Sequence, residues 1–365
     1  MPATNLFDYL TWRGDILWNG APFGKIDGMI LARFAYAPFQ LTILGNRSNY
    51  ASLKEITDAL LQFPTIRSNL LDPEDLNLFS ALGDAARFSS LQIGNVWNVF
   101  DPIEETQFSA NTIFLNDHLA CLCFRGTDNT LVGWKESINL GVTCPIASQT
   151  LALEYTEDFT ENWSGDILLL GHSKGGNLAS YAAISCSPQC QKKIKAVYNY
   201  DGPGFPDSLL TSKGYTEIKD RIETYVPQSS IVGLLLGHAE EHSVIHSLES
   251  VMPLQHNLYS WAVLGNDFVY EDTLTTASRY LDSTLKEWLG HMSITKREAF
   301  VEAIYAILST TKAETLNQLT DNLLPNSKTV LQAMRGMDED TKATISDGIS
   351  LFLKSAWKHF RTLRE

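Results

Sequence analysis

The sequence predicts an α/β fold in which a mainly parallel central sheet is flanked by helices. Three observations lead to this prediction. An apolar strand, a sharp glycine-containing turn and a helix of small residues follow one another at residues 166–184, in DILLLGHSKGGNLASYAAI. Predicted strands alternate with helical stretches between residues 108 and 226, which implies parallel pairing through right-handed crossovers. Helical periodicity dominates before and after this region.

The first ninety residues predict a helical lead-in. Apolar residues recur at helical spacing in four segments, at residues 7–18, 26–39, 52–63 and 72–88. Ser52 is a candidate N-cap with Glu55 three positions later, which is the spacing of a capping box. Asp72 and Pro73 are typical entry residues for the fourth segment.

Strand signals begin at residue 108. Residues 108–115 and 119–124 predict a hairpin with Asn116 and Asp117 in its turn. A long helix is expected at residues 147–161, and two further strands are expected at residues 194–200 and 222–226. These elements complete the predicted sheet.

The chain beyond about residue 271 is predicted to be helical. Apolar spacings of three and four occur in four segments, at residues 278–290, 296–310, 314–324 and 347–360. We therefore expect an α/β domain with its lead-in at residues 1–271, followed by a C-terminal helical segment at residues 272–365.

Composition and charge exclude several classes of protein. A formal net charge of -14 repels phosphate, so nucleic-acid binding is not expected. The first residues, MPATNLFDYL, have no basic segment followed by a long apolar run, and we expect neither a secretory signal nor a stable membrane anchor. Five cysteines, an odd number without zinc-ribbon spacing, favour a reduced, cytoplasmic protein.

The segment Gly171-His172-Ser173-Lys174-Gly175 has the Gly-x-Ser-x-Gly pattern of a nucleophile elbow. Such a serine occupies a strained backbone position, and small residues two before and two after it let strand and helix approach. The following helix would direct its N-terminus at negative charge forming on Ser173. The alternative is a glycine-rich turn with a solvated serine.

A second polar loop, Arg125-Gly126-Thr127-Asp128, follows the strand at residues 119–124. The loop therefore lies at the edge of the sheet where the parallel strands end, and open α/β folds bind ligands at this carboxyl edge. Elbow enzymes stabilise an oxyanion with the N–H after the serine and a group from an earlier strand loop, which predicts Lys174 and Thr127 for this role. Thr127 is alternatively a capping or turn-forming residue.

The loop FRGT at residues 124–127 followed by GHSKGG resembles class 3 lipases. More closely, the chain resembles a bacterial family of uncharacterised proteins related to those lipases, over about residues 5–265. The similarity includes FDYLTWRGDI, FRGTDNTLVGWKE, YDGPGF, VPQSSIVG and QHNLYSW. The resemblance implies an α/β-hydrolase fold and a serine hydrolase, and it does not imply a substrate.

The histidine of such a site comes late in the chain, after the nucleophile and the acid. Six histidines follow Ser173: His238, His242, His246, His256, His291 and His359. His256 lies in a short polar turn and matches the histidine motif of the family, so we predict that it is the base. A surface or core histidine is the alternative. His172 is expected to orient the elbow.

The position of the acid departs from the pattern of class 3 lipases. In class 3 lipases it follows the strand that here reads RIETYVPQSSIVG, yet residues 228–230 contain no carboxylate. Asp201 ends the preceding strand at the same edge of the sheet and is predicted to orient His256. It is alternatively an Asx-turn residue that serves Gly202 and Pro203.

Two further parts of the sequence bear on function. The residues His238, Glu240, Glu241, His242 and His246 are metal-ligand types, but their order is not His-Glu-x-x-His and the segment looks extended, so no metal is expected. The apolar residues 231–236, with Met252 and Leu254, predict either a flap over a pocket or core packing.

The sequence thus predicts a serine hydrolase of the lipase or carboxylesterase kind that needs no cofactor and acts on a small acyl ester or a lipid-like substrate. Two alternatives remain open. One is a noncatalytic protein that uses this fold to bind a ligand, and the other is a peptidase or acyltransferase with the same three residues.

Overall fold

The computed structural model describes residues 4–311 and 336–362, together with Thr315, Gln318, Thr329 and Gln332. The chain divides into two compact units. The first comprises residues 1–99, 108–126 and 148–275, and the second comprises residues 100–107, 127–147 and 276–365. Each unit is described by itself.

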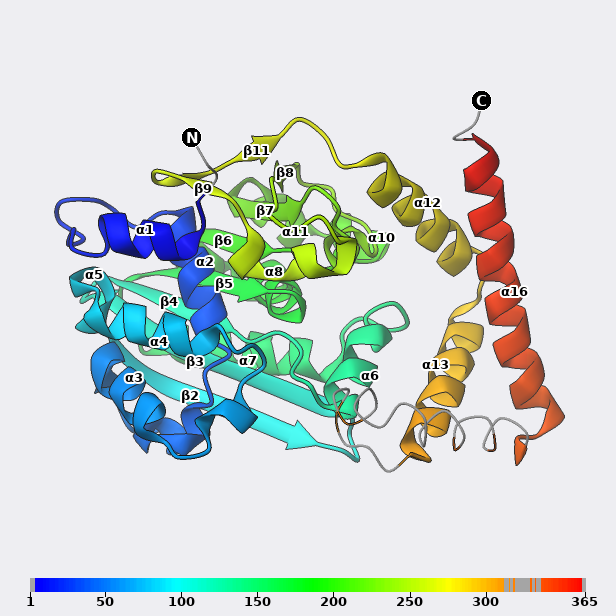
Figure 1. The fold of residues 1–365 in the computed structure, drawn as a ribbon, viewed down its shortest axis with the longest axis horizontal. Helices are drawn as coiled ribbons and strands as arrows, with labels where there is room; N and C mark the ends of the chain where they lie inside the picture. The colour runs from blue at the N-terminus through cyan, green and yellow to red at the C-terminus, as the bar shows by residue number, and fades with distance from the viewer. Residues whose placement is uncertain are drawn as a thin grey trace. The chain divides into compact units, whose positions relative to one another are not determined.

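A nine-stranded sheet runs through the first unit in the order β1-β2-β3-β4-β5-β6-β7-β8-β11 (Figure 1). Its strands are β1 (Ala51–Ser52), β2 (Gln92–Asp101), β3 (Thr106–Asn116), β4 (Leu119–Phe124), β5 (Asp166–His172), β6 (Ile194–Tyr200), β7 (Ile222–Pro227), β8 (His242–Ile245) and β11 (Tyr270–Glu271). The five strands from β4 to β8 pair in parallel. Antiparallel pairs join β1 to β2, β3 to β4 and β8 to β11. The predicted hairpin and the mainly parallel centre are therefore confirmed.

The centre of the sheet is buried on both faces. In β5, Leu168 and Leu170 join the hydrophobic core that also contains α2 (Lys25–Phe34). Because side chains alternate along a strand, Ile167 and Leu169 face the other side, and both are fully buried. The helix α8 (Lys174–Ser185) packs on β4, β5 and β6, as α2 does on its own side. Burial on both faces explains the continuous apolar run before the elbow.

Ten α-helices, seven 3-10 turns and a two-stranded ribbon complete the first unit among the described residues. Besides α2 and α8, the helices are α1 (Leu6–Arg13), α3 (Leu53–Gln62), α4 (Asp75–Asp84), α5 (Ala86–Ser89), α7 (Ala147–Glu161), α9 (Pro188–Lys193), α10 (Asp207–Leu210) and α11 (Lys213–Ile218). The 3-10 turns are η1 (Phe39–Leu41), η2 (Ile43–Gly45), η3 (Ile66–Asn69), η4 (Lys219–Arg221), η5 (Val232–Leu234), η6 (Met252–His256) and η7 (Leu258–Ser260). The ribbon pairs β9 (Val263–Leu264) with β10 (Asp267–Phe268).

Several predicted elements are confirmed, and their caps explain where they begin. The Ser52 hydroxyl accepts from the Glu55 N–H at 3.2 Å, and the Glu55 carboxylate accepts from the Ser52 N–H at 2.8 Å, so the predicted capping box is present. The helix α7 has the predicted bounds, and so does β6.

Other boundaries differ from the prediction. The helix expected at residues 26–39 ends at Phe34. It cannot continue to Pro38, because a proline disfavours the helical conformation of the residue that precedes it. The helix expected at residues 72–88 is interrupted at Ala85, whose backbone is extended, and becomes α4 and α5. The strand β2 is not predicted, because Gly94 and Asn95 are turn-type residues, and Asn95 has a φ of 51°.

The second unit is mainly helical among its described residues. It contains α6 (Leu131–Asn139), α12 (Thr276–Gly290), α13 (Ile294–Ser309) and α16 (Glu339–Thr362). The helix α16 packs against α12 and α13, with Ala303, Ile307 and Ile345 as a small core. Three of the four predicted C-terminal helices are thus confirmed, and the fourth, at residues 314–324, lies almost wholly outside the described residues.

Lys135 on α6 is nearly fully buried in the second unit. Its ammonium group pairs with Glu105 and, at 2.7 Å, with Glu302 on α13, and it lies 4.5 Å from the centre of the Tyr305 ring. These contacts offset the cost of burying the charge. None of the helices in the described part of the chain is long and apolar enough to cross a membrane.

Candidate active site

Ser173 lies at a strained turn between β5 and α8. Its backbone has a φ of 59° and a ψ of -133°, a conformation that residues with a side chain rarely adopt. A Cβ atom at Gly171 would lie 2.0 Å from the Gly175 carbonyl oxygen, and one at Gly175 would lie 2.1 Å from the Phe124 carbonyl oxygen. Both positions therefore require glycine. The predicted strand, sharp turn and helix are present.

His256 and Asp201 form a hydrogen-bonded pair. The Nδ1 atom of His256 lies 2.6 Å from Oδ2 of Asp201. The Asp201 side chain is fully buried, whereas 28% of the His256 side chain is exposed. Since an ionised carboxylate only accepts, Nδ1 donates, and the neutral ring then carries its lone pair on Nε2. This is the tautomer that a general base acting through Nε2 requires.

The loop after Asp201 packs against the serine turn. A Cβ atom at Gly202 would lie 2.6 Å from the Ser173 carbonyl oxygen. Asn177 on α8 donates to the carbonyls of Pro203 and Gly204, each at 3.0 Å. The first turn of α8 therefore fastens the loop that carries Asp201. No local sequence pattern marks Asn177 for this role, because its partners lie 26 and 27 residues away.

The second oxygen of Asp201 is held by residues that follow β7. Oδ1 accepts from the Ser230 hydroxyl at 2.5 Å and from the Gly233 N–H at 3.1 Å. A Cβ atom at Gly233 would lie 2.3 Å from this oxygen, so the residue must be glycine. The segment that lacks a carboxylate thus supplies donors to Asp201. Both residues fall within the motif VPQSSIVG, and this was the signal available in the sequence.

His172 joins the serine turn to the turn that carries His256. Its Nε2 atom lies 2.8 Å from the His256 carbonyl oxygen, and the centres of the two rings are 4.5 Å apart. Because a carbonyl only accepts, Nε2 donates, and Nδ1 accepts from the Tyr36 hydroxyl at 3.1 Å. Tyr36 remains a protonated donor, since burial raises its pKa to about 12.

Burial also holds the pKa of His172 well below its usual value of 6.5. A protonated His256 ring and the charge of Arg33 lower this pKa further, while the hydrogen bond to the His256 carbonyl acts in the opposite direction. His172 is therefore a neutral residue with a fixed tautomer. This geometry agrees with the expectation that it orients the elbow.

Hydrogen bonds on both sides of His256 fix its turn. The Gln255 side chain accepts from the Ser229 N–H at 2.9 Å and donates to the Glu249 carbonyl at 2.8 Å. On the other side, the Asn257 amide donates to Asp72 at 2.6 Å. The main chain of His256 is therefore held from three directions, counting the bond from His172.

The two residues predicted to stabilise an oxyanion lie in different units. Lys174 is the first residue of α8, and its side chain is 1% exposed. Thr127 belongs to the second unit, where its hydroxyl lies 2.5 Å from that of Ser137, which in turn donates to the Gly133 carbonyl. The oxyanion role of both residues stays a prediction.

The histidine and glutamate residues between positions 238 and 246 do not meet as one set of ligands. His238 lies 2.9 Å from Glu240, whereas His246 lies 2.7 Å from Glu271. Burial acts to raise the pKa of Glu240, but the hydrogen bonds and charge of His238 and a bond from Tyr215 prevail and lower it to about 2. His238 with Glu240 and His246 with Glu271 thus form two separate hydrogen-bonded pairs.

The apolar segment at residues 231–236 is partly packed. Leu234 is buried in the short turn η5, next to Gly233, which contacts Asp201. Apolar exposure is greater in the segment that precedes His256, where Val251 and Leu254 are 53% and 52% exposed. The exposed apolar side chains nearest to His256 in the sequence thus lie in the turn η6 and in Val251, which precedes it.

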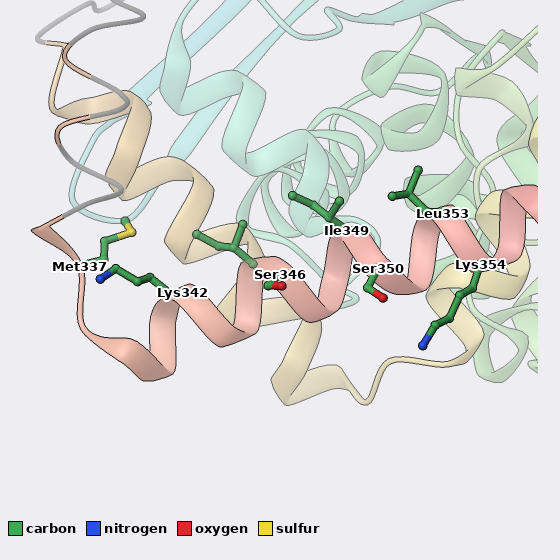
Figure 2. Close-up of a pocket in the computed structure, with 8 residues that line it drawn as sticks. Met337, Lys342, Ser346, Ile349, Ser350, Leu353 and Lys354 are labelled. Carbon is green, nitrogen blue, oxygen red and sulfur yellow. The ribbon is translucent and has the colours of Figure 1, made fainter.

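A cavity of about 660 Å³ lies in the second unit, along one face of α16 (Figure 2). It is lined by Met337, Lys342, Ile345, Ser346, Ile349, Ser350, Leu353 and Lys354. None of the residues of the candidate active site contributes to its lining. Ile349 and Leu353 are 48% and 61% exposed, so this face of α16 is apolar and open.

These features define a mixed α/β protein in which a strained serine turn lies beside a histidine-carboxylate pair. The chain belongs to the Mbeg1-like family, which it matches over residues 82–306. A search of curated proteins finds no match.

Two lipase structures resemble the fold remotely. A Rhizomucor miehei lipase in a propeptide complex is 14% identical, with 69% of this chain and 73% of that chain covered and a TM-score of 0.38. The M37 lipase is 15% identical, with 56% and 68% covered and a TM-score of 0.31. These likenesses are too remote to carry a functional argument, which rests on the residues of this chain.

Proposed function

We propose that this protein is a serine hydrolase of the lipase or carboxylesterase kind, built on an α/β-hydrolase fold related to that of class 3 lipases. The observation that carries the proposal is the 2.6 Å contact between His256 Nδ1 and Asp201 beside the strained turn of Ser173. A buried carboxylate, a partly exposed imidazole and a serine at a strand-to-helix turn are the parts that acyl transfer needs.

In this mechanism Ser173 attacks the acyl carbonyl. His256 takes the hydroxyl proton on Nε2 and returns it to the leaving alcohol, and water then releases the acyl group by the same route. Asp201 keeps the ring in the required tautomer and stabilises the imidazolium. The Lys174 N–H stabilises the oxyanion, and Thr127 is the residue that the sequence predicts for the second contribution.

Neutral acyl esters and lipid-like molecules are the proposed substrates. The approach to His256 carries exposed apolar side chains, and the chain has a formal net charge of -14, which disfavours anionic substrates. The chemistry requires no cofactor. We place this activity in residues 1–271 and regard residues 272–365 as an appended helical segment.

Labelling with a fluorophosphonate probe tests the proposal. The probe should attach to Ser173, as read by mass spectrometry of the labelled peptide, and Ser173→Ala should abolish labelling. The exposed Ser208 on α10 offers a matched control, since Ser208→Ala removes a hydroxyl from a neighbouring part of the unit without touching the site. An unlabelled but folded wild-type chain would favour a noncatalytic binding protein instead.

A further inference from the structure

Three side chains of metal-ligand type meet at the end of α8 that is opposite Ser173. Glu157 comes from α7, Cys186 follows α8 directly, and Cys190 lies in α9. Each offers one ligand atom, and the three atoms lie within 4.8 Å of one another. Among the described residues this is the one group of three or more histidine, cysteine, aspartate or glutamate side chains that meets this condition.

The cluster is enclosed and its carboxylate is oriented. Cys186 and Cys190 are 7% and 2% exposed, and both are free thiols. The Glu157 carboxylate accepts from the Ser187 N–H at 2.5 Å and from the Ser187 hydroxyl at 3.0 Å. Ser187 thus holds Glu157 against the turn between the two cysteines. An ionised carboxylate has about four acceptor positions, so capacity for a metal ion remains.

We propose that Glu157, Cys186 and Cys190 bind a thiophilic divalent cation of the zinc class. Two thiolates select soft or borderline ions over magnesium and calcium, which prefer oxygen ligands. In a tetrahedral site with zinc-sulfur bonds of about 2.3 Å, the sulfur atoms are roughly 3.8 Å apart. The two sulfur atoms therefore need to approach each other by about 1 Å at most, and each sulfur needs to approach the carboxylate oxygen by little more.

The neighbouring charges balance in the bound state. Two thiolates and one carboxylate carry three negative charges, and the cation supplies two positive charges. The third positive charge comes from Lys193, which ends the same helix α9 that contains Cys190 and whose ammonium group donates to the carbonyls of Thr160 and Trp163, each at 2.5 Å. Binding breaks two S–H bonds, forms two metal-sulfur bonds and releases two protons to the solvent, without electron transfer.

A cation at this position would fasten α7 to the junction of α8 and α9. Ser173 precedes the twelve residues of α8, so the cluster is separated from it by about 18 Å of helix at 1.5 Å per residue. The cation therefore acts on stability and takes no part in the chemistry of Ser173. The inference is independent of the proposed hydrolase activity.

Titration of the reduced, chelator-treated full chain with Co²⁺ tests the proposal. We expect one equivalent to bind with the ultraviolet charge-transfer absorption of thiolate-bound Co²⁺. X-ray absorption of the Zn²⁺-loaded wild-type chain should show two sulfur atoms at about 2.3 Å in a shell otherwise made of oxygen. This measurement needs no variant, so a folding defect cannot obscure it.

Variants identify the ligands. Cys186→Ser and Cys190→Ser should each lose the charge-transfer band, whereas Glu157→Gln should keep it and weaken Co²⁺ binding about tenfold, since both sulfur ligands remain. Cys121→Ser is the matched control, because Cys121 is a fully buried cysteine in β4, outside the cluster. It should keep both the band and the affinity.

Three results would overturn the proposal. The first is a wild-type chain that binds no Co²⁺ through sulfur. The second is a zinc coordination shell with no sulfur atom or with four. The third is a charge-transfer band that persists unchanged in Cys186→Ser and in Cys190→Ser. Formation of a disulfide between Cys186 and Cys190 in the presence of excess Zn²⁺ and air, read as a loss of two mass units, would also count against a metal site.

Discussion

The hydroxyl of Ser230 donates to Oδ1 of Asp201 at 2.5 Å, while the other oxygen of that carboxylate lies 2.6 Å from the His256 ring. The two oxygens of Asp201 therefore have different tasks. One is anchored by residues that follow β7, and the other faces the candidate base. The candidate acid directly follows β6, and its support comes from the segment after the neighbouring strand β7.

Asp201→Asn should leave the fold intact and lower kcat for ester hydrolysis by about 10³- to 10⁴-fold, because an amide cannot fix the tautomer of His256 in the same way. Ser230→Ala should lower kcat about ten- to hundredfold, since a hydrogen bond to a charged group contributes roughly 1.5–3 kcal/mol. Steady-state kinetics with a neutral ester measure both. A larger loss in Ser230→Ala than in Asp201→Asn would contradict the assignment of the acid.

His256→Ala should reduce hydrolysis as severely as Ser173→Ala does, and the double variant should be no worse, because residues that act as a unit are not additive. His246→Ala is the matched control. That residue is paired with Glu271 on the edge strand, so its removal should leave kcat/KM within about twofold. If His246→Ala proved as damaging as His256→Ala, another histidine would have to be the base.

His172 should make the stability of the protein depend on pH below about 6.5. Its pKa is depressed in the folded chain, so the unfolded chain takes up a proton that the folded chain does not. The free energy of unfolding then falls as pH decreases, by up to about 1.4 kcal/mol per pH unit between the unfolded and the folded pKa.

Urea denaturation of His172→Gln between pH 7 and pH 5 measures this contribution, which should be absent from the variant. The control is His118→Gln, which removes an exposed histidine from the turn between β3 and β4. Identical pH slopes for the wild type and for His172→Gln would show that His172 titrates normally in the fold.

Neutral acyl esters should be hydrolysed faster than charged ones. Each methylene buried in an apolar site contributes about 0.8 kcal/mol, or roughly fourfold in kcat/KM, until the acyl site is filled. A succinylated ester adds a carboxylate that must lose its hydration, and the net charge of -14 repels it. Rates for an acyl-length series beside the succinylated ester measure this preference, and faster cleavage of the succinylated ester would refute it.

Local features of the site were open to prediction from sequence. The serine turn is specified by glycines within two positions of Ser173, and the contacts of Gly171 and Gly175 give the steric reason. The parallel centre follows from the alternation of apolar strands and helices. Both features depend on neighbours in the chain, which is the information that periodicity and turn chemistry carry.

Contacts between distant segments could not be predicted in the same way. Tyr36 meets His172 across 136 residues, and Ser230 meets Asp201 across 29. No local pattern marks Tyr36, which lies near the end of what the periodicity describes as an ordinary helix. Such pairs depend on which loops the strand order brings to one edge of the sheet. The spacing of apolar residues along the chain does not determine that order.

Two of the three residues proposed for the chemistry hold uncommon backbone conformations, since Ser173 has a φ of 59° and Asp201 a φ of 53°. Each such conformation costs of order 1–3 kcal/mol, against a total stability of about 5–15 kcal/mol for a typical domain. The largely buried strands β5 and β6, which lead into these two turns, must offset that cost. Mutations that loosen the centre of the sheet should therefore impair these two turns before they unfold the chain, so that function is lost ahead of structure.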